Sequence, residues 1–382
     1  MLSISGVAGG VSGALFVLVA FLFVLTIVVF FHELGHFLAA RWCGVKVKAF
    51  SIGFGREIYG FYDRHGTRWR LAWIPLGGYV KFIDDENAAS APSAETLERM
   101  SPEERAGSFH AKPLHKRAAV VAAGPIANFL LAIVIFAVMF AFVGVRTTAP
   151  VVDKVLADAP AARAGFKAGD LVLEIDGRQI DSFNDVLRVV SANAGRELAV
   201  KIDRGGASMI LKVTPEAKEF DDTMGGKIRR GVIGIQRAAG EVKKAGPLEA
   251  LWLGVRETEF IVTSTLHYLA DVLTGRATAD QLRGPIGIAE ISGQVAKIGI
   301  EALLHLVAVI SVSVGLINLF PIPLLDGGHL MFYAIEAVRR RPLSERTQEI
   351  GFRIGLAVVL MLMVFATWND LPIVKRWLIG TG

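Results

Sequence analysis

The hydrophobic residues of this chain fall into four long apolar stretches that are separated by polar segments. The first, Ala14–Phe31, has Thr26 as its single polar residue. A helix needs about 20 mainly apolar residues to cross the hydrocarbon core of a bilayer. We therefore predict transmembrane helices at about residues 12–40, 118–145, 303–319 and 354–368.

The polar segment between the first two predicted spans has the alternation of apolar and polar residues that is typical of β-strands. Val45–Ile52 and Trp69–Ile74 alternate in this way, and residues 63–66 (Asp-Arg-His-Gly) between them form a turn signal. Apolar strands next to a transmembrane helix predict a β-hairpin that associates with the membrane. An ordinary cytoplasmic hairpin is the alternative.

A second polar segment predicts a small α+β domain at residues 150–238. Gly, Asp and Pro separate short β-rich runs there, and one amphipathic helix fits Ser182–Ser191. The predicted strands are Val151–Val155, Leu171–Ile175, Leu198–Ile202 and Met209–Val213.

Residues 248–273 carry acidic and basic side chains on an apolar background, which favours a helix on the membrane surface over a further span. The chain as a whole is predicted to be a polytopic α-helical membrane protein with four transmembrane helices, a membrane-associated β-hairpin region and one α+β domain. The expected parts are residues 1–149 with the first two spans and the hairpin, 150–238 with the α+β domain, 239–300 as an amphipathic connecting region, and 301–382 with the last two spans.

Composition and charge agree with this assignment. Of the 382 residues, 53% are hydrophobic, a high share that is typical of membrane proteins. The net charge of +5 is modest, and the basic residues cluster beside the apolar stretches, so we expect the lipid bilayer as a partner and no nucleic acid. The same basic residues place the hairpin loop in the cytoplasm and residues 150–238 outside it. The single cysteine, Cys43, excludes an intramolecular disulfide and a thiolate zinc cluster.

An H-E-x-x-H motif lies at the end of the first predicted span. On a helix, His32 and His36 are one turn apart and point to the same side, as two imidazoles that bind one zinc ion must. Glu33 lies about a quarter-turn round the helix, where it can act as general base on a water molecule at the metal. Ionisable side chains beside an apolar stretch are costly in lipid and usually mark a functional site.

Catalytic zinc takes three protein ligands, so a further ligand is needed. The third span ends in the stretch 318–329, where two prolines and two glycines cannot continue a regular helix. Asp326 is the only acid in this stretch, and topology places it at the same side of the membrane as the two histidines. We expect Asp326 to be the third ligand. A helix N-cap is the alternative role for Asp326, and His329 is a rival ligand.

These residues indicate metal-assisted hydrolysis of a peptide bond. Glu33 would take a proton from the zinc-activated water and later pass it to the leaving amine. A donor such as Asn318 could polarise the scissile carbonyl. A transmembrane substrate must unwind before attack, and an edge strand of the hairpin at residues 45–82 could hold it by β-addition.

Three motifs, one in each of the first three spans, resemble those of the site-2 protease family, and of its bacterial regulator-of-sigma-E intramembrane zinc metalloproteases in particular. They are His32-Glu33-x-x-His36, Gly124-Pro-x-x-Asn128-Phe129 and Asn318-x-x-Pro321-x-Pro323-x-Leu325-Asp326-Gly327. The resemblance implies His32, His36 and Asp326 as zinc ligands, Glu33 as the catalytic acid/base and Asn318 as a substrate-positioning residue.

The resemblance also implies that residues 150–238 form a PDZ-like domain, because the run Ala164–Val172 resembles the core of bacterial PDZ domains. Well-known enterobacterial members carry two such domains, whereas this chain has room for one. The implied setting is the bacterial inner membrane, with the active site near the cytoplasmic side and the PDZ-like domain in the periplasm. The implied substrates are single-span membrane proteins such as an anti-sigma factor, cut in regulated intramembrane proteolysis, or signal-peptide remnants.

Two other functions fit part of the pattern. A membrane scaffold or zinc carrier would need the metal ligands and the binding domain, but it would not need Glu33 beside the ligands. A membrane-anchored metalloprotease that acts on soluble peptides would usually take its third ligand from a Glu on a downstream helix, and the motif at Asp326 argues against it.

Overall fold

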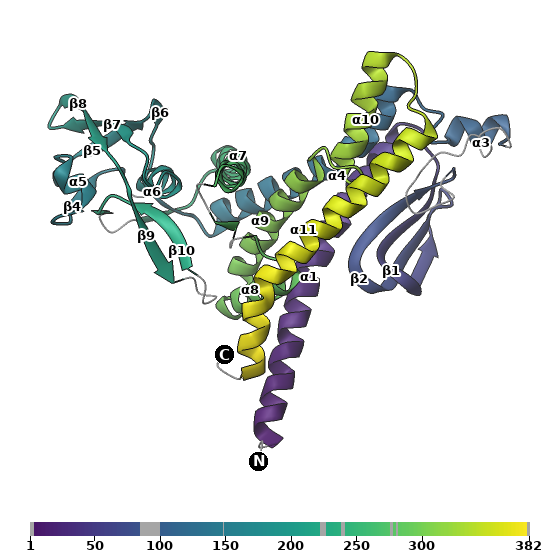
Figure 1. Ribbon diagram of the computed structural model, residues 1–382, viewed down its shortest axis with the longest axis horizontal. Coiled ribbons are helices and arrows are strands. Elements are labelled where there is room, and N and C mark those ends of the chain that lie inside the picture. The colour runs from purple at the N-terminus through teal and green to yellow at the C-terminus, as the bar shows by residue number, and fades with distance from the viewer. Residues whose placement is uncertain are drawn as a thin grey trace. The chain divides into compact units, whose positions relative to one another are not determined.

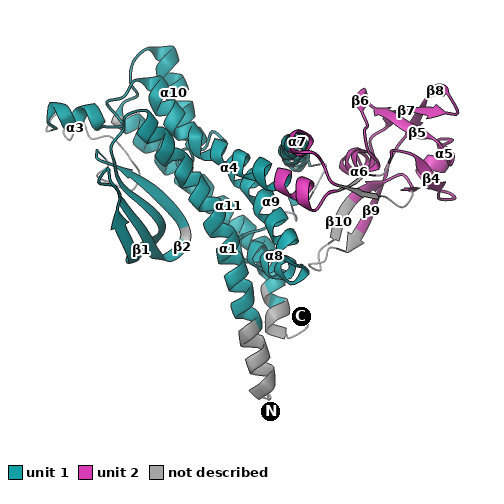
Figure 2. Cartoon of the chain, turned by 180° about the vertical axis from the view of Figure 1, so that it is seen from behind, with its two compact units in different colours: residues 1–136, 251–382 teal, residues 137–250 magenta. Residues whose placement is uncertain are grey.

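The computed structural model describes residues 4–84, 100–147, 149–221, 227–237, 241–275, 278–279 and 282–379. The chain divides into two compact units (Figure 2). Unit 1 holds residues 1–136 and 251–382, and unit 2 holds residues 137–250. The predicted α+β domain at residues 150–238 lies within unit 2.

Helices dominate unit 1 (Figure 1). The helices that belong to it wholly or in part are α1 (Ile4–Trp42), α3 (Pro102–Gly107), α4 (Leu114–Phe142), α7 (Pro247–Leu273), α8 (Pro285–Ile298), α9 (Ile300–Asn318), α10 (Asp326–Arg339) and α11 (Glu345–Ile379). Helices α8 and α10 were not predicted, because each is short and lies next to a long apolar stretch that dominates the hydrophobic pattern.

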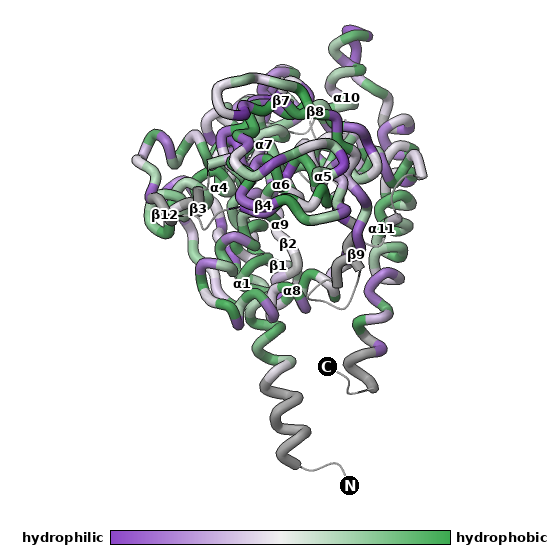
Figure 3. Tube along the Cα trace, turned by 90° about the vertical axis from the view of Figure 1, so that its left-hand side faces the viewer, coloured by the Kyte–Doolittle hydropathy of each residue, from purple (hydrophilic) through white to green (hydrophobic). Residues whose placement is uncertain are grey.

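Within the described residues, four helices are long and apolar enough to cross a membrane, which agrees with the four predicted spans. They are Gly13–Trp42 in α1, Leu114–Phe142 in α4, Ile300–Asn318 in α9 and Arg346–Ile373 in α11. The apolar character of α1 is visible along the part of the helix that Figure 3 colours. The amphipathic helix α7 is not one of the four, as its charged residues led us to expect.

Small and β-branched residues allow close packing around α1. Val24 and Val28 of α1 are buried against Leu303 and Val307 of α9. A side chain at Gly35 would collide with the backbone carbonyl of Ala123 in α4. Helices in membranes associate through such close van der Waals contacts.

The α4 helix runs without a break through the Gly124–Pro125 pair, which has Pro125 in its interior. Proline and glycine within a membrane helix are expected to loosen it and to let neighbouring helices pack closely. Only the second expectation holds, since a Cβ at Gly124 would overlap the ring of His36.

The hairpin consists of β1 (Val47–Tyr62) and β2 (Arg68–Phe82), both longer than predicted, and it lies beside α1 (Figure 1). Both strands bend, so the first part of β1, residues 49–52, pairs with residues 68–71 on one side and with residues 78–81 on the other. The later part of β1, residues 57–62, pairs with residues 68–72 alone. The end of β2 and the end of β1 are therefore the two outer edges of the sheet.

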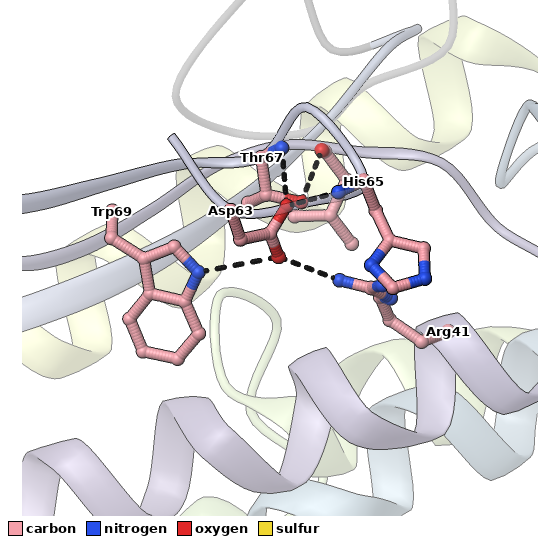
Figure 4. Close-up of polar contacts among 6 residues, drawn as sticks. Arg41, Asp63, His65, Thr67 and Trp69 are labelled. Carbon is pink, nitrogen blue, oxygen red and sulfur yellow. Dashed lines mark hydrogen bonds and ion pairs between the residues drawn. The ribbon is translucent and has the colours of Figure 1, made fainter. Parts of the chain in front are cut away.

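Asp63 joins the hairpin turn to the end of α1 (Figure 4). Its carboxylate accepts hydrogen bonds from the backbone amides of His65 and Thr67, both at 2.9 Å. It also accepts one from the Arg41 guanidinium at 2.8 Å and one from the indole Nε1 of Trp69 at 3.4 Å. These hydrogen bonds connect the hairpin to α1, the helix that carries the two histidines.

Unit 2 contains the four predicted strands, as β4, β5, β7 and β8, and the predicted helix, as α6, together with further elements that the sequence did not predict. Its elements are β3 (Val145–Thr147), β4 (Val152–Val155), α5 (Pro160–Arg163), β5 (Leu171–Ile175), β6 (Arg178–Gln179), α6 (Phe183–Ala192), β7 (Leu198–Arg204), β8 (Ala207–Val213), β9 (Glu216–Asp221), β10 (Lys227–Val232), β11 (Ile235–Arg237) and β12 (Glu241–Lys243). Strands β6-β5-β7-β8 form one sheet, and the others pair two by two.

A single apolar core holds unit 2 together. Val172, Leu198 and Ile202 are fully buried in it, and α6 contributes Val186 and Val190. Ser182 caps α6 and forms a capping box with Asp185. The sequence did not predict β9 and β10, because both strands are rich in charged residues and lack an apolar alternation.

Candidate metal centre

The α1 helix places His32 and His36 one turn apart within its membrane-length segment. Their rings meet nearly at right angles, with centroids 4.8 Å apart and an interplanar angle of 86°. In this arrangement the two Nε2 atoms lie 3.3 Å from each other. The helix therefore presents both Nε2 lone pairs to a shared point.

The helix break that we predicted at the end of the third span brings Asp326 close to Nε2 of His32 and Nε2 of His36. The α9 helix ends at Asn318, the next residues are irregular, and α10 begins at Asp326. A side chain at Gly327 would collide with the carbonyls of Leu319 and Phe320, so the close turn depends on glycine there. The N-cap position of α10 is Leu325 and has no side-chain cap, which excludes the alternative role for Asp326.

Three donor atoms converge from these two elements. Oδ2 of Asp326 lies 3.2 Å from Nε2 of His32 and 3.5 Å from Nε2 of His36. Two ligand atoms that each lie about 2.0–2.1 Å from one tetrahedral ion are about 3.3–3.4 Å apart, so the three separations match a single zinc-sized site. The three side chains are the one group of metal-binding residues found among the described residues.

The environment of the Asp326 carboxylate also indicates a site for a cation. Oδ2 of Asp326 is buried and has no hydrogen-bond partner within the described parts of the chain, although both histidine nitrogens are near it. Only 17% of the Asp326 side chain is exposed, and 12–13% of each histidine side chain. A buried carboxylate oxygen without a donor is costly, and a bound cation would remove this cost. The residues present therefore fit a zinc ion.

His329, the rival ligand, points elsewhere. Its ring centroid lies 5.5 Å from that of Phe352 and 6.5 Å from that of Tyr333. It lies one turn along α10 from Asp326 and is not part of the converging group.

Glu33 lies on α1 between the two histidines and faces the hairpin. A Cβ at Gly78 of β2 would be 2.8 Å from Cγ of Glu33 and 2.8 Å from the carbonyl oxygen of Ser51. Gly78 therefore allows the outer edge of the hairpin sheet to touch the glutamate. Glycines in a hairpin allow tight turns and close backbone approach, but residue type alone does not identify Glu33 as the contact.

Asn318 is the last residue of α9 and is half-buried. It stands at the start of the irregular stretch that ends at Asp326. Asn318 and Asp326 thus stand at the two ends of the irregular stretch between α9 and α10.

The α4 helix supplies contacts that the sequence did not reveal. Nδ1 of His36 lies 2.9 Å from the backbone carbonyl oxygen of Val120, and the side chain of Asn128 lies beside His32. An asparagine near the membrane could bond another helix or lie at the interface, and the structure shows Asn128 bonded to another helix. No sequence signal identifies Val120, because its contribution is a backbone carbonyl.

The fold and this group of side chains define a class: a metalloprotease with membrane-length helices, whose candidate metal ligands lie on α1 and at the start of α10. Comparison with known proteins agrees. The sequence profile of "Peptidase family M50" matches residues 20–362. The chain belongs to this family, the site-2 proteases, and is a zinc metalloprotease.

Its curated relatives cover almost the whole chain. A protein of Rhizobium meliloti is 52% identical over 94% of this chain and 96% of its own length, and one of Agrobacterium fabrum is 51% identical over 93% and 95%. Both are named "Putative zinc metalloprotease". The metalloprotease MmpA of Caulobacter vibrioides is 42% identical over 94% of this chain and 96% of its own.

Solved structures that resemble a part of the chain include a PDZ domain. The PDZ domain of an SdrC-like protein from Listeria monocytogenes covers 24% of this chain and 93% of its own, at 26% identity and a TM-score of 0.19. Since that TM-score is low, we keep the PDZ-like nature of residues 150–238 as a prediction.

Proposed function

We propose that this protein is an intramembrane endoprotease that cuts transmembrane segments of other membrane proteins. The observation that carries the proposal is the convergence of His32 and His36, on the membrane-length helix α1, with Asp326 at the start of the shorter helix α10. In this proposal the three side chains are the zinc ligands. Zinc, when bound, supplies a Lewis acid and lowers the pKa of water toward neutrality.

Glu33 is the general base and acid of the proposed reaction. It takes a proton from the attacking water and gives one to the leaving amine. Its contact with Gly78 directs the outer edge of the hairpin toward the reacting atoms. Asn318, at the end of α9, is the proposed donor to the scissile carbonyl or to the substrate backbone.

The outer edge at residues 78–82 is the proposed substrate-binding strand. A helical peptide bond is shielded by its own hydrogen bonds, so a transmembrane substrate must become extended before attack. An edge strand offers unpaired backbone N–H and C=O groups to such a segment. Because Gly78 touches Glu33, an added strand would pass beside the catalytic group.

The charge distribution and the relatives support the proposed cellular setting. The relatives are bacterial, and the basic residues near the ends of the spans favour a cytoplasmic hairpin. We place the protein in the bacterial inner membrane, with the active site near the cytoplasmic side and residues 150–238 in the periplasm as a PDZ-like domain. Anti-sigma factors and signal-peptide remnants are the proposed substrates.

A Glu33→Gln variant tests the proposed reaction. The variant keeps the three ligands and removes only the proton acceptor, so we expect zinc content to stay at the parent level. Cleavage of a transmembrane peptide by the purified protein should fall by a factor of about 100 or more, because general base catalysis contributes about 10²–10⁴. Cleavage at the parent rate would contradict the proposed mechanism, and lost zinc would show that Glu33 has a structural role instead.

A further inference from the structure

One helix, α4, supplies a polar partner to each histidine of the metal centre. The backbone carbonyl of Val120 lies 2.9 Å from Nδ1 of His36. About two turns further along, the side-chain amide of Asn128 lies 3.3 Å from Nδ1 of His32. Gly124, between them, leaves room for the His36 ring.

The chemistry of metal binding fixes what these partners must be. An imidazole that gives its Nε2 lone pair to an ion carries its proton on Nδ1, and that proton needs an acceptor. A carbonyl oxygen can only accept, so Val120 selects this tautomer of His36. For His32, the matching acceptor is Oδ1 of Asn128.

The two ends of the Asn128 amide have opposite effects on His32. With Nδ2 donating to Nδ1 of His32, the ring proton must be on Nε2, which withdraws that nitrogen from the ion. With Oδ1 accepting from Nδ1, Nε2 is free to bind. Nδ2 is the nearer end in the structure, and Oδ1 is buried with no hydrogen-bond partner among the residues described. Rotating the Asn128 amide by 180° about its last side-chain bond exchanges Nδ2 and Oδ1 and gives Oδ1 the N–H group at Nδ1 of His32 as its partner.

The surroundings of Asn128 hold it at the centre of the helix bundle. Its exposed fraction is 0%. The Ser311 hydroxyl of α9 donates to its backbone carbonyl at 2.9 Å. A Cβ at Gly315, one turn further along α9, would be 3.2 Å from Cβ of Asn128. The amide therefore has little freedom except rotation about its last side-chain bond.

We propose that Asn128 is a positioning residue that selects the metal-binding tautomer of His32. The proposal rests on the proposed ligand set. Asn128 touches neither substrate nor ion, and it acts through the orientation and protonation site of one imidazole.

Zinc affinity of the full-length protein in detergent, measured by competition with a chromophoric chelator, tests this role. Asn128→Leu keeps the shape of the side chain and removes both polar ends, and we expect zinc to bind about 10–100-fold more weakly. Asn128→Asp has oxygens that can only accept, and its zinc affinity should stay within about threefold of the parent. Ser313→Ala, which removes a hydrogen bond within α9 alone, is the matched control and should bind zinc like the parent.

The His32→Ala background separates this proposal from the ligand assignment. If Asn128 acts through His32, Asn128→Leu should cause no further loss of zinc affinity in that background. An additional loss of tenfold or more would overturn the proposal, as would parent-like zinc affinity of Asn128→Leu alone. If His32→Ala itself leaves zinc affinity unchanged, the ligand set is wrong, and the proposal fails with it.

Thermal unfolding of the metal-free variants distinguishes positioning from a purely structural role. A positioning role predicts a smaller rise in melting temperature on adding zinc to Asn128→Leu than to the parent. A structural role predicts a lower melting temperature without zinc and an unchanged rise, which would contradict the proposal. If Asn128→Leu does not fold, Asn128→Ala replaces it, and its zinc affinity and its rise in melting temperature on adding zinc are measured in the same way.

Discussion

At the scale of single residues, a few donor and acceptor atoms decide what this protein can bind. The separations among Nε2 of His32, Nε2 of His36 and Oδ2 of Asp326 are 3.2–3.5 Å, which is the spacing of ligands around one small ion. Glu33 stands beside them, and Gly78 opens the space through which the hairpin reaches it.

Asp63 illustrates a residue whose contribution depends on pH. Burial alone would raise its pKa, but the amides of Thr67 and His65 and the side chains of Arg41 and Trp69 outweigh this and lower the pKa to about 2. A carboxyl group with a lowered pKa stabilises the folded state above its ordinary pKa of 3.8. This contribution is lost as the pH falls toward 2.

We therefore expect Asp63→Asn to lower the free energy of unfolding by about 1 kcal/mol at pH 7, because the hydrogen bonds to a charged group are only partly shielded from water. The difference between parent and variant should shrink as the pH falls from 5 to 3. Unfolding curves in detergent across this range measure it, with the exposed Asp153→Asn as control. A difference that stays constant with pH would contradict this account of Asp63.

The sequence predicted the candidate ligands because their motifs are local. Two histidines four residues apart, and an acid within a run of prolines and glycines, can be recognised without coordinates. The partners of these residues could not be predicted. Val120 contributes a backbone carbonyl, and Gly78 contributes an absent side chain, so neither leaves a signature in residue type.

At the scale of elements, the hairpin connects the proposed substrate to the proposed active site. Its bent strands create two outer edges, one at residues 78–82 and one at residues 57–62. Only the first contains the glycine that touches Glu33. This difference makes the two edges matched sites for a test of substrate binding.

Proline substitutions at the two edges should have different effects on cleavage. Proline removes a backbone N–H, and successive residues of a strand direct this group alternately to the paired strand and to the free edge. In the parent protein, either Tyr79 or Val80 directs its backbone N–H to the free edge. Replacing that residue by proline breaks no hydrogen bond within the sheet, so this variant should fold and bind zinc like the parent. We expect its rate of transmembrane-peptide cleavage to fall by roughly tenfold, the worth of about one hydrogen bond.

Gly60→Pro and Phe61→Pro at the other edge provide the control pair, and the better-folded of these should cleave at the parent rate. Equal cleavage by the folded variants of both edges would remove the hairpin from the proposed substrate path.

Element prediction succeeded where hydrophobicity dominates. The four membrane-length helices, the hairpin and the strands β4, β5, β7 and β8 all follow the apolar pattern. Helices α8 and α10 and the charged strands β9 and β10 were missed, since their formation depends on neighbours that are distant in the sequence. Pro125 was misjudged in part for the same reason, because the continuity of α4 is set by packing against α1 and α9.

At the scale of the whole molecule, the central prediction is the orientation of the chain in the membrane. The hairpin belongs to unit 1, and the expected periplasmic domain belongs to unit 2. In the proposed topology, the positive charges near the ends of the spans favour opposite sides of the membrane for these two parts.

Cysteine labelling tests this orientation, because Cys43 is the single native thiol. In a Cys43→Ser background, Ala168→Cys should react with a membrane-impermeant maleimide in intact spheroplasts. Arg64→Cys, in the hairpin turn, should react only after the membrane is made permeable. The reverse pattern would contradict the proposed placement of the active site at the cytoplasmic side.

The most direct test of the account is X-ray absorption at the zinc edge of the full-length protein. We expect one zinc per chain, with two imidazole nitrogens and a carboxylate oxygen at about 2.0–2.2 Å and no sulfur. In Asp326→Ala the oxygen contribution should fall and the zinc content should drop. A sulfur ligand, or a full zinc content with unchanged coordination in Asp326→Ala, would show that His32, His36 and Asp326 do not share one ion.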